Sequence, residues 1–507
     1  MMLSLAALLS AHAAPLTYPP APRGDVVDDL HGTKVADPYR WLEDLDSPQT
    51  TAWVEAQNKV TFGFLETLPQ RAWFRERLTK LWNYPRIGVP VKEGGRYFFS
   101  KNSGLQNQAV YYVQEKLDAA PRVLIDPNTL AVDGTVALTS TRVSRDGKWV
   151  IYGTAAAGSD WTGYRVRSVD TGQDLPDRIQ WSKFGSATWT RDNAGFFYSR
   201  YPTPKADAGS GKTFSGLSHQ RMYYHKLGTP QEHDRLIHEV PEEPKWFVRG
   251  GTTEDCRYLV IYVERGSSSE NLLRYVDLAD PMAPNLAAPV VTLTPEWIGE
   301  HRVVGNDGAV FYVVTNLNAP RKRLVAIDLK DPAPAKWKTL VPESEDVIEA
   351  VDIIGGRFVV KSMHDASSRL AVYAKDGKPL GLIRLPGLGS VASVSGREDE
   401  NEFFYNFISF NTPATNFRHD VATNRGEVFQ APQVAFNPAD YETKQVFYTS
   451  KDGTRVPMFI THRQGLKLDG NAPTLLYAYG GFDISMTPAF SVSNLAWMEA
   501  GGVYALP

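Results

Sequence analysis

The residues best suited to chemistry in this sequence are a tyrosine and two glycines at the end of an apolar segment. Residues 474–479 read as a buried strand, and Gly480 and Gly481 follow Tyr479 directly. Glycines let a backbone approach a ligand closely, and a phenol hydroxyl can donate a hydrogen bond to developing negative charge. The segment therefore indicates a group that stabilises an oxyanion, although a strand-end tyrosine is also common in a protein core.

A nucleophile to accompany Tyr479 is missing from the sequence. No Gly-x-Ser-x-Gly pattern lies on a predicted strand-to-helix turn, and the serines within residues 209–212 and 387–390 fall in loops that no helix follows. Without a paired serine and histidine there is no activated nucleophile. We therefore expect a fragment or partial gene product that stops before the nucleophile and is inactive alone.

The elements around Tyr479 have the order of an α/β unit. After the strand and the glycine loop, residues 495–498 read as a short helix and residues 503–506 as a further strand. A hairpin with a Lys-Asp-Gly turn precedes them, over residues 445–460.

A turn followed by an aromatic or β-branched strand recurs along most of the chain. A repeat of roughly 45 to 65 residues that contains several short strands is typical of a propeller blade. Seven copies predict seven blades, and an array of β-sandwiches is the alternative. The copies lie at residues 94–99, 144–152, 190–198, 253–260, 305–312, 354–360 and 399–405.

The region before the repeat reads as helical. Ser47 is a suitable N-cap and Pro48 a suitable first helical residue, and an apolar stripe runs from Trp53 to Leu68. A second helix precedes Tyr84. We expect both helices to lie on the surface of another part of the protein.

Composition excludes several classes of protein. Apolar residues make up 42% and charged residues 22% of the 507 residues, and the formal net charge is −3. Such a charge provides no field to attract nucleic acid or an anionic membrane. The single cysteine, Cys256, excludes an internal disulfide and a cysteine zinc cluster, and it reads as a small turn residue. No metal or other cofactor is indicated.

The N-terminus suggests export. Residues 1–13 form an apolar run with small residues at a suitable cleavage position, but without the usual positive charge before it. The run is too short to cross a bilayer. We expect a signal peptide and a periplasmic or secreted protein, with a cytoplasmic protein as the alternative.

Several segments resemble signatures of the prolyl oligopeptidase family of serine peptidases. Residues 477–488, Tyr-Ala-Tyr-Gly-Gly-Phe-Asp-Ile-Ser-Met-Thr-Pro, resemble that family's oxyanion loop. Residues 31–44 resemble its N-terminal signature, and residues 104–108 and 158–161 resemble segments of its propeller. The resemblance runs from about Tyr18 to the last residue.

The resemblance implies a mainly β protein, in which a seven-bladed β-propeller joins an α/β-hydrolase domain built from both chain ends. The corresponding parts are residues 18–84, an N-terminal helical part of the peptidase domain, residues 85–433, the propeller, and residues 434–507, the start of the catalytic domain. Members of the family cleave short peptides on the carboxyl side of proline with a Ser-Asp-His triad. The implied partners are short proline-containing peptides, the implied state is a monomer, and no nucleic acid or membrane is implied.

The family's functional residues map onto four positions here. Tyr479 matches the tyrosine whose hydroxyl helps to stabilise the oxyanion, and Phe482 matches an aromatic residue of the proline-binding S1 pocket. Phe184 and Phe247 fall where the propeller contributes apolar contacts to the next subsites. Ser267 stands where some members carry a reactive cysteine, so thiol sensitivity through that position is not expected.

Two other functions fit the same sequence features. A propeller without catalysis could bind peptides or proteins as a scaffold, and the downstream reading frame would distinguish it from a peptidase. A dipeptidyl or acylaminoacyl peptidase could share the architecture, and substrates with free and blocked N-termini would separate these activities.

Overall fold

The computed structural model describes residues 15–156, 158–203, 217–482 and 484–507. The predicted signal peptide, residues 1–13, lies outside this part. Contacts divide the chain into two units: the described residues of Met1–Trp82, His462–Leu475 and Val492–Tyr504, and those of Asn83–Thr461, Leu476–Ser491 and Ala505–Pro507. No helix in the described ranges is long and apolar enough to span a bilayer.

The first unit contains the helices. As predicted, α1 (Pro48–Glu66) begins after Ser47, whose Oγ accepts a hydrogen bond from the backbone N–H of Thr50 at 3.1 Å. This bond satisfies one of the N–H groups that a helix start leaves without a partner. α2 (Gln70–Trp82) contacts α3 (Val492–Glu499).

Two smaller features complete the first unit. β1 (Val27–Leu30) and β2 (Thr33–Ala36) form an antiparallel hairpin around His31 and Gly32, which both have positive φ values. A bidentate ion pair between Arg77 of α2 and Glu499 of α3 joins the two ends of the chain. The N-terminal helices therefore belong with the C-terminal segment.

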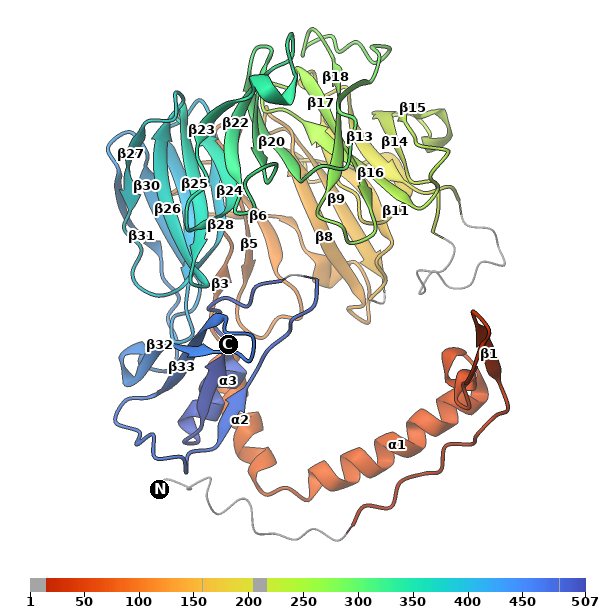
Figure 1. Ribbon diagram of the computed structural model, residues 1–507, viewed down its shortest axis with the longest axis vertical. Helices are drawn as coiled ribbons and strands as arrows, with labels where there is room; N and C mark the ends of the chain where they lie inside the picture. The colour runs from red at the N-terminus through yellow and green to blue at the C-terminus, as the bar shows by residue number, and fades with distance from the viewer. Residues whose placement is uncertain (1–14, 157, 204–216, 483) are drawn as a thin grey trace. The chain divides into compact units, whose positions relative to one another are not determined.

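The second unit holds seven antiparallel sheets, which confirm the predicted β-propeller (Figure 1). Six of these sheets have four strands in sequence order, and the first sheet has five. Blade 1 contains β3 (Arg86–Ile87), β4 (Val91–Glu93), β5 (Arg96–Asn102), β6 (Val110–Gln114) and β7 (Arg122–Ile125). Blade 2 contains β8 (Val136–Val143), β9 (Trp149–Ala156), β10 (Thr162–Ser168) and β11 (Asp174–Ser182); blade 3 contains β12 (Ala187–Trp189), β13 (Gly195–Arg200), β14 (Arg221–Lys226) and β15 (Arg235–His238).

The remaining blades repeat the same meander. Blade 4 contains β16 (Trp246–Thr252), β17 (Tyr258–Arg265), β18 (Asn271–Asp277) and β19 (Val291–Thr294); blade 5 contains β20 (His301–Asp307), β21 (Val310–Thr315), β22 (Arg323–Asp328) and β23 (Lys338–Val341). Blade 6 contains β24 (Val347–Ile354), β25 (Arg357–His364), β26 (Ser367–Ala374) and β27 (Pro379–Ile383); blade 7 contains β28 (Ser390–Gly396), β29 (Glu402–Ile408), β30 (Thr415–Asp420) and β31 (Arg425–Gln430).

Every copy of the repeat seen in the sequence supplies the second strand of one blade. These strands are β5, β9, β13, β17, β21, β25 and β29. A second strand is paired on both edges and covered on both faces, so its aromatic and β-branched residues are mostly buried. The apolar cores lie between neighbouring sheets, as where Tyr312 of blade 5 meets Phe358 of blade 6 with ring centroids 5.0 Å apart. Separate sandwiches would not share cores in this way, so the sandwich alternative is wrong.

The first strands of the blades lie nearest the centre of the ring. β12 contacts β8 and β16, and β24 contacts β20 and β28. Each of these first strands therefore meets the first strands of both neighbouring blades, as expected of strands that surround the centre of a ring. In an antiparallel meander, the turns between first and second strands all lie at one end of the ring. The opposite end holds the links that lead from one blade to the next.

Four charged side chains meet across the first of these ends. Arg397 of blade 7 lies 2.7 Å from Glu93 of blade 1 and 3.1 Å from Glu254 of blade 4. Arg145 of blade 2 lies 3.2 Å from Glu254 and 3.8 Å from Glu93. Burial raises the pKa of Glu93 to about 8, against the lowering effect of Arg145. These blades are not all neighbours, so the cluster ties together distant parts of the ring.

At pH 9, above the pKa of Glu93, replacing Arg397 with alanine should lower the free energy of unfolding by about 2 kcal/mol, because two partly buried carboxylates then lose one of their two shared cations. Denaturation in urea, followed by tryptophan fluorescence, measures the change. Arg257→Ala is the matched control, because its ion pair with Asp277 is exposed and should contribute less than about 1 kcal/mol. Equal losses for the two variants would show that the cluster contributes nothing beyond an ordinary surface pair.

A separate sheet follows the propeller, with the strand order β32-β33-β35-β34. β32 (Tyr441–Thr449) and β33 (Arg455–Arg463) are the predicted hairpin, α3 is the predicted short helix, and β35 (Val503–Leu506) is the predicted last strand. The prediction of a buried strand over residues 474–479 was wrong. β34 covers only Thr474–Leu476 and lies at the sheet edge, where it borders β35 alone, so Leu476 is 62% exposed. That this sheet begins a hydrolase domain stays a prediction.

Candidate active site

Tyr479 lies in the loop that follows β34. The strand ends at Leu476, and the N–H of Tyr477 donates to the carbonyl of Ala505 at 3.0 Å. Tyr479 itself is 52% exposed, so its phenol ring is not packed in a dry interior. A hydroxyl placed in this way is accessible to a bound substrate, and its role as an oxyanion donor stays a prediction.

The two glycines after Tyr479 permit this conformation. Gly480 has φ +73°, a left-handed value that is costly for residues with a side chain. A Cβ atom at Gly481 would lie only 3.1 Å from the ring of Tyr479, which is closer than ordinary contact. The ring of Tyr479 therefore lies over the backbone of Gly481, where the Cβ atom of any other residue would crowd it.

Phe482 presents an apolar ring on the same loop. It is 76% exposed, and its φ of +56° is unusual for a bulky residue. Backbone strain of this kind, on the order of 1–3 kcal/mol, is found most often at functional sites. The geometry is compatible with packing against a substrate ring, and the S1 assignment stays a prediction.

Phe184 and Phe247 are brought into contact by the fold. Their rings meet edge to face with centroids 6.2 Å apart, although they come from the link between blades 2 and 3 and from the start of β16 in blade 4. The guanidinium carbon of Arg249 lies 4.6 Å from the centroid of Phe247, and Nζ of Lys183 lies 5.3 Å from that of Phe184. Both cations are within the range of a cation–π attraction. The pair is thus an aromatic surface bordered by positive charge.

The loop that carries Tyr479 is bonded to the same end of the propeller as this aromatic pair. Ser390, the first residue of β28, donates a hydrogen bond from Oγ to the carbonyl of Pro488 at 2.7 Å. Phe184, Phe247 and Ser390 all lie where one blade leads to the next, which is the end opposite the ion cluster. Among the described ring contacts, none joins Tyr479 or Phe482 to the Phe184–Phe247 pair.

Cysteine chemistry is not part of this arrangement. Ser267 is exposed in the turn between β17 and β18, where the resemblance places a cysteine in some family members. Cys256 lies in the turn between β16 and β17, as predicted for a turn residue, and is only 8% exposed. Burial raises the pKa of its thiol, which disfavours the reactive thiolate.

Two hydroxyl–imidazole contacts occur among the described residues. Ser218 Oγ lies 3.1 Å from Nδ1 of His219, and Thr315 Oγ1 lies 3.0 Å from Nδ1 of His301. In neither pair does a described carboxylate bond the other ring nitrogen, and burial lowers the pKa of His301 to about 4. We assign the role of nucleophile to neither.

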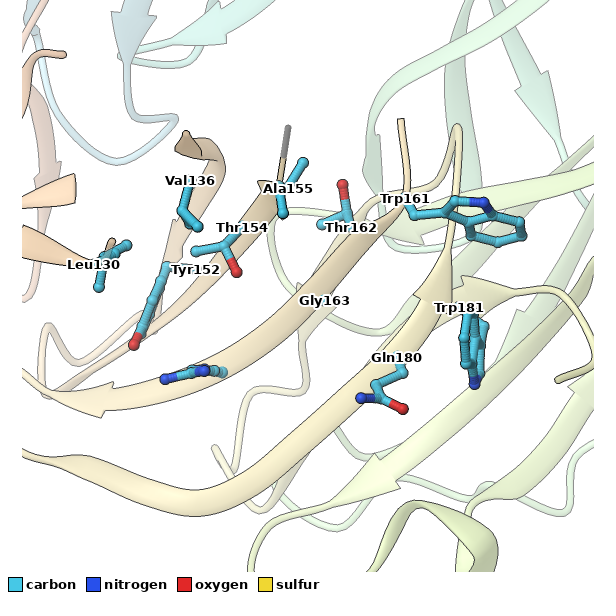
Figure 2. A pocket seen from close by; sticks show the side chains of 12 residues that line it. Leu130, Val136, Tyr152, Thr154, Ala155, Trp161, Thr162, Gly163, Gln180 and Trp181 are labelled. Atoms are coloured by element: carbon cyan, nitrogen blue, oxygen red, sulfur yellow. The ribbon is translucent and has the colours of Figure 1, made fainter. Parts of the chain in front are cut away.

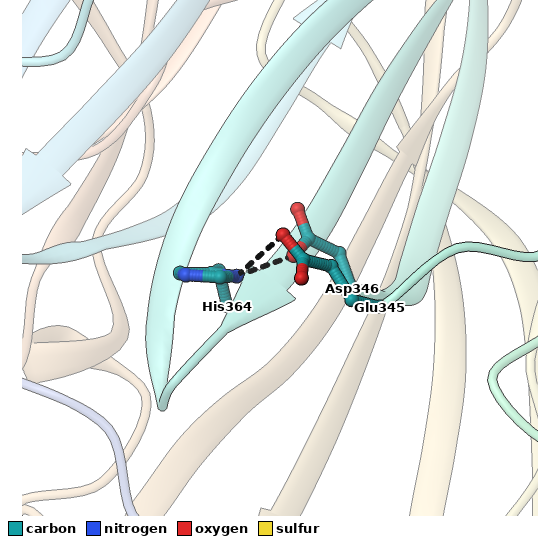
Figure 3. Close-up of side chains that lie close together, drawn as sticks. All are labelled: Glu345, Asp346 and His364. Atoms are coloured by element: carbon teal, nitrogen blue, oxygen red, sulfur yellow. Dashed lines mark hydrogen bonds and ion pairs between the residues drawn. The ribbon is translucent and has the colours of Figure 1, made fainter.

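One described group has the composition of a metal site. Glu345, Asp346 and His364 converge on one hairpin of blade 6, and Figure 3 shows the imidazole of His364 turned toward both carboxylates. His364 Nδ1 lies 2.5 Å from Asp346 Oδ1, and Arg369 Nη1 lies 3.0 Å from Asp346 Oδ2. Because the imidazole of His364 and the guanidinium of Arg369 already contact both oxygens of Asp346, we assign no metal to this group.

Comparison with known proteins decides the family. Residues 19–432 match the family model described as the N-terminal β-propeller domain of prolyl oligopeptidase. The chain belongs to the prolyl oligopeptidase family. The match covers the seven blades and the N-terminal helices, as the sequence resemblance predicted.

Relatives of this oligopeptidase-family chain match it along nearly its whole length. It is 38% identical to a prolyl endopeptidase of Elizabethkingia meningoseptica, over 99% of this chain and 70% of the relative. It is 31% identical to a dual-function macrocyclase-peptidase of Galerina marginata, over 97% of this chain and 71% of the relative.

Solved structures of the family have the same fold. A prolyl endopeptidase structure from a study of inter-domain dynamics superposes with a TM-score of 0.90 at 36% identity, covering 97% of this chain and 71% of that one. Prolyl oligopeptidase B of Galerina marginata, bound to a 35mer hydrolysis and macrocyclization substrate, gives a TM-score of 0.90 at 30% identity, covering 97% and 72%.

Proposed function

We propose that this chain is the propeller and part of the catalytic domain of a serine-type oligopeptidase that cleaves short peptides on the carboxyl side of proline. The observation that carries the proposal is the 38% identity to a prolyl endopeptidase over 99% of this chain, which includes the loop with Tyr479 and Phe482. Relatives are peptidases, and one of them binds a 35mer substrate.

The loop after β34 supplies two roles in this proposal. The exposed ring of Phe482 packs against the pyrrolidine ring of the substrate proline, because both surfaces are apolar and rigid. The hydroxyl of Tyr479 donates a hydrogen bond to the oxyanion that forms when a serine attacks the carbonyl after proline. We assign the serine, its histidine base and the acid to the part of the relatives' sequences that this chain does not cover.

The aromatic pair on the propeller receives the residues next to the proline. Phe184 and Phe247 offer two rings inclined at 79°, with Arg249 and Lys183 beside them. An extended peptide held there and at Phe482 is fixed at two points, which positions its carbonyl for attack. We also propose that the enzyme works as a monomer and outside the cytoplasm, since these residues lie on one chain and its first residues resemble an export signal.

The test compares two blocked peptides that differ only in proline or alanine before the cleaved bond. The intact enzyme should show a kcat/KM at least about 10-fold higher for the proline peptide, because an apolar pocket distinguishes substrates by the area it buries. A fluorophosphonate should abolish both rates. Equal rates for the two peptides, or cleavage only of free or acylated N-terminal residues, would replace this proposal with one of the related peptidase activities.

A further inference from the structure

A pocket that none of these roles uses lies beside blade 2. Its volume is about 320 Å³, and it is lined by β9, β10, β11 and the link that leads from blade 1 to β8 (Figure 2). Tyr152 on its wall also packs into the apolar core that blades 1 and 2 share. The pocket is therefore a gap between two blades, left where blade 1 does not cover the face of blade 2.

Two tryptophans form one end of the pocket. Figure 2 shows Trp161 and Trp181 at the end away from Leu130 and Tyr152. Their ring centroids lie 5.8 Å apart at 86°, and Trp161 lies 5.5 Å from Nζ of Lys183, the cation that also borders Phe184. The aromatic surface at Phe184 thus continues into the pocket.

The backbone of Trp181 is held in a costly conformation. Its φ is +65°, and among the described residues Phe184 and Phe482 are the only other Phe, Tyr or Trp residues with a positive φ. Both of those already have a proposed role in binding substrate. The carbonyl of Trp181 accepts a hydrogen bond from the N–H of Tyr201 at 2.9 Å, which helps to hold the strained residue in place. Strain maintained at a bulky aromatic residue indicates a binding function.

The pocket is also basic. Arg165 of β10 lines it, and Arg178 of β11, which is not a lining residue, lies opposite Arg165 in the strand register and therefore on the same face of the sheet. Within the described part of the chain, neither arginine lies within 4 Å of a carboxylate. Arg178 donates instead to the carbonyls of Leu175 and Asp177. An exposed arginine without a carboxylate partner gains charge-assisted hydrogen bonds when a carboxylate binds beside it.

We propose that this pocket binds a segment of a peptide that carries a carboxylate beside a proline or aromatic ring. The ring packs against Trp161 and Trp181, and the carboxylate pairs with Arg165 and Arg178. This inference rests on the proposed function, because the occupant is a remote part of the peptide substrate that has extended past Phe184. The enzyme therefore prefers longer peptides with an acidic residue at a distance from the cleaved bond.

The test measures binding by the 507-residue chain itself and requires no catalysis. The probe is the blocked tetrapeptide acetyl-Glu-Pro-Phe-Glu-amide, titrated by calorimetry, and the same peptide with Gln in place of Glu is its control. Arg165→Gln should weaken binding of the Glu peptide by about 2- to 5-fold, the equivalent of one exposed charge pair. The Gln peptide should bind the wild-type and variant chains equally.

Arg235→Gln is the matched control variant, because Arg235 is exposed on β15, the outermost strand of blade 3, and no residue of that blade lines the pocket. It should leave binding unchanged. Arg178→Gln provides a second variant, and it should weaken binding as Arg165→Gln does. Equal affinity for the Glu and Gln peptides, or an equal loss in Arg235→Gln, would overturn the assignment.

The outcomes separate this inference from the proposed function. Loss of binding in Arg165→Gln, together with no preference for proline in the cleavage assay, would support the pocket and reject post-proline cleavage. Cleavage after proline, together with no saturable binding of the Glu peptide, would reject the pocket alone.

Discussion

Replacing Tyr479 with phenylalanine in the intact peptidase should lower kcat by about 100- to 1,000-fold, with little change in KM. A single donor aimed at an oxyanion contributes about this much because it acts on charge that develops only in the transition state. Steady-state kinetics on a blocked proline peptide measures the loss. The thermal midpoint should not move, since the ring of Tyr479 is 52% exposed and removing its hydroxyl leaves no cavity.

Tyr477→Phe is the matched control for this experiment. Tyr477 lies two residues earlier on the same segment and is 45% exposed, and we assign it no role in the reaction. Its variant should keep kcat within about two-fold, as expected for an exposed position outside the site. If Tyr479→Phe also keeps its turnover, the oxyanion donor is another group and the loop acts only in binding.

The second large effect concerns a histidine buried between blades 2 and 3. His225 has no exposed surface, and its ring nitrogens lie 2.9 Å from Asp177 and 2.7 Å from Asp234. Tyr198 also donates to Asp234, at 2.6 Å. Burial disfavours the charged imidazole, but the hydrogen bonds to Asp234 and Asp177 outweigh it and raise the pKa of His225.

Replacing His225 with leucine should lower the free energy of unfolding by about 3–5 kcal/mol, because two buried carboxylates then lose the cation between them. Blade 7 contains a matched control. The ring of His419 packs against Phe403 with centroids 5.0 Å apart, as His225 does against Phe196 at 5.1 Å, but it bonds Asn424 rather than a carboxylate. His419→Leu leaves no buried charge and should cost about 1–2 kcal/mol.

The pH dependence of the two variants should have opposite signs. The stabilisation by His225, whose pKa is raised, is complete below about pH 6.5 and decreases as the pH rises through its folded value. Burial lowers the pKa of His419, so its contribution is present above about pH 6.5 and decreases at lower pH. Denaturation of both variants between pH 5 and pH 9 measures the difference. A constant difference for His225→Leu would show that its imidazole is not charged in the folded protein.

The propeller could be predicted because its signals are local. Each blade repeats a turn and an apolar strand within about ten residues, and Ser47 with Pro48 marks the start of α1. The burial of residues 474–479 could not be predicted in the same way. An apolar run indicates a strand, but only the neighbouring strands and helices decide whether that strand lies inside a sheet or at its edge.

The strand-end tyrosine and its two glycines indicated a candidate oxyanion donor, whereas the other candidate site residues came only from family resemblance. Tyr479 and Phe482 lie three residues apart, and their loop is visible in the printed sequence. Nothing in their spacing indicates the edge-to-face contact between Phe184 and Phe247, or the left-handed backbone of Trp181. The sequence analysis also missed the position of Arg165 opposite Arg178. Only the register of β10 and β11 shows that these two residues are neighbours.

The sequence by itself determined the number of blades, the positions of their strands and the identity of the loop that carries Tyr479. Only the tertiary structure decided which charges and rings meet, such as Arg397 with Glu93, 304 positions away along the chain. The physical reason is the separation along the chain between the residues that interact. Strand patterns follow from the side chains of adjacent residues, whereas contacts across a ring depend on how every blade between them is packed.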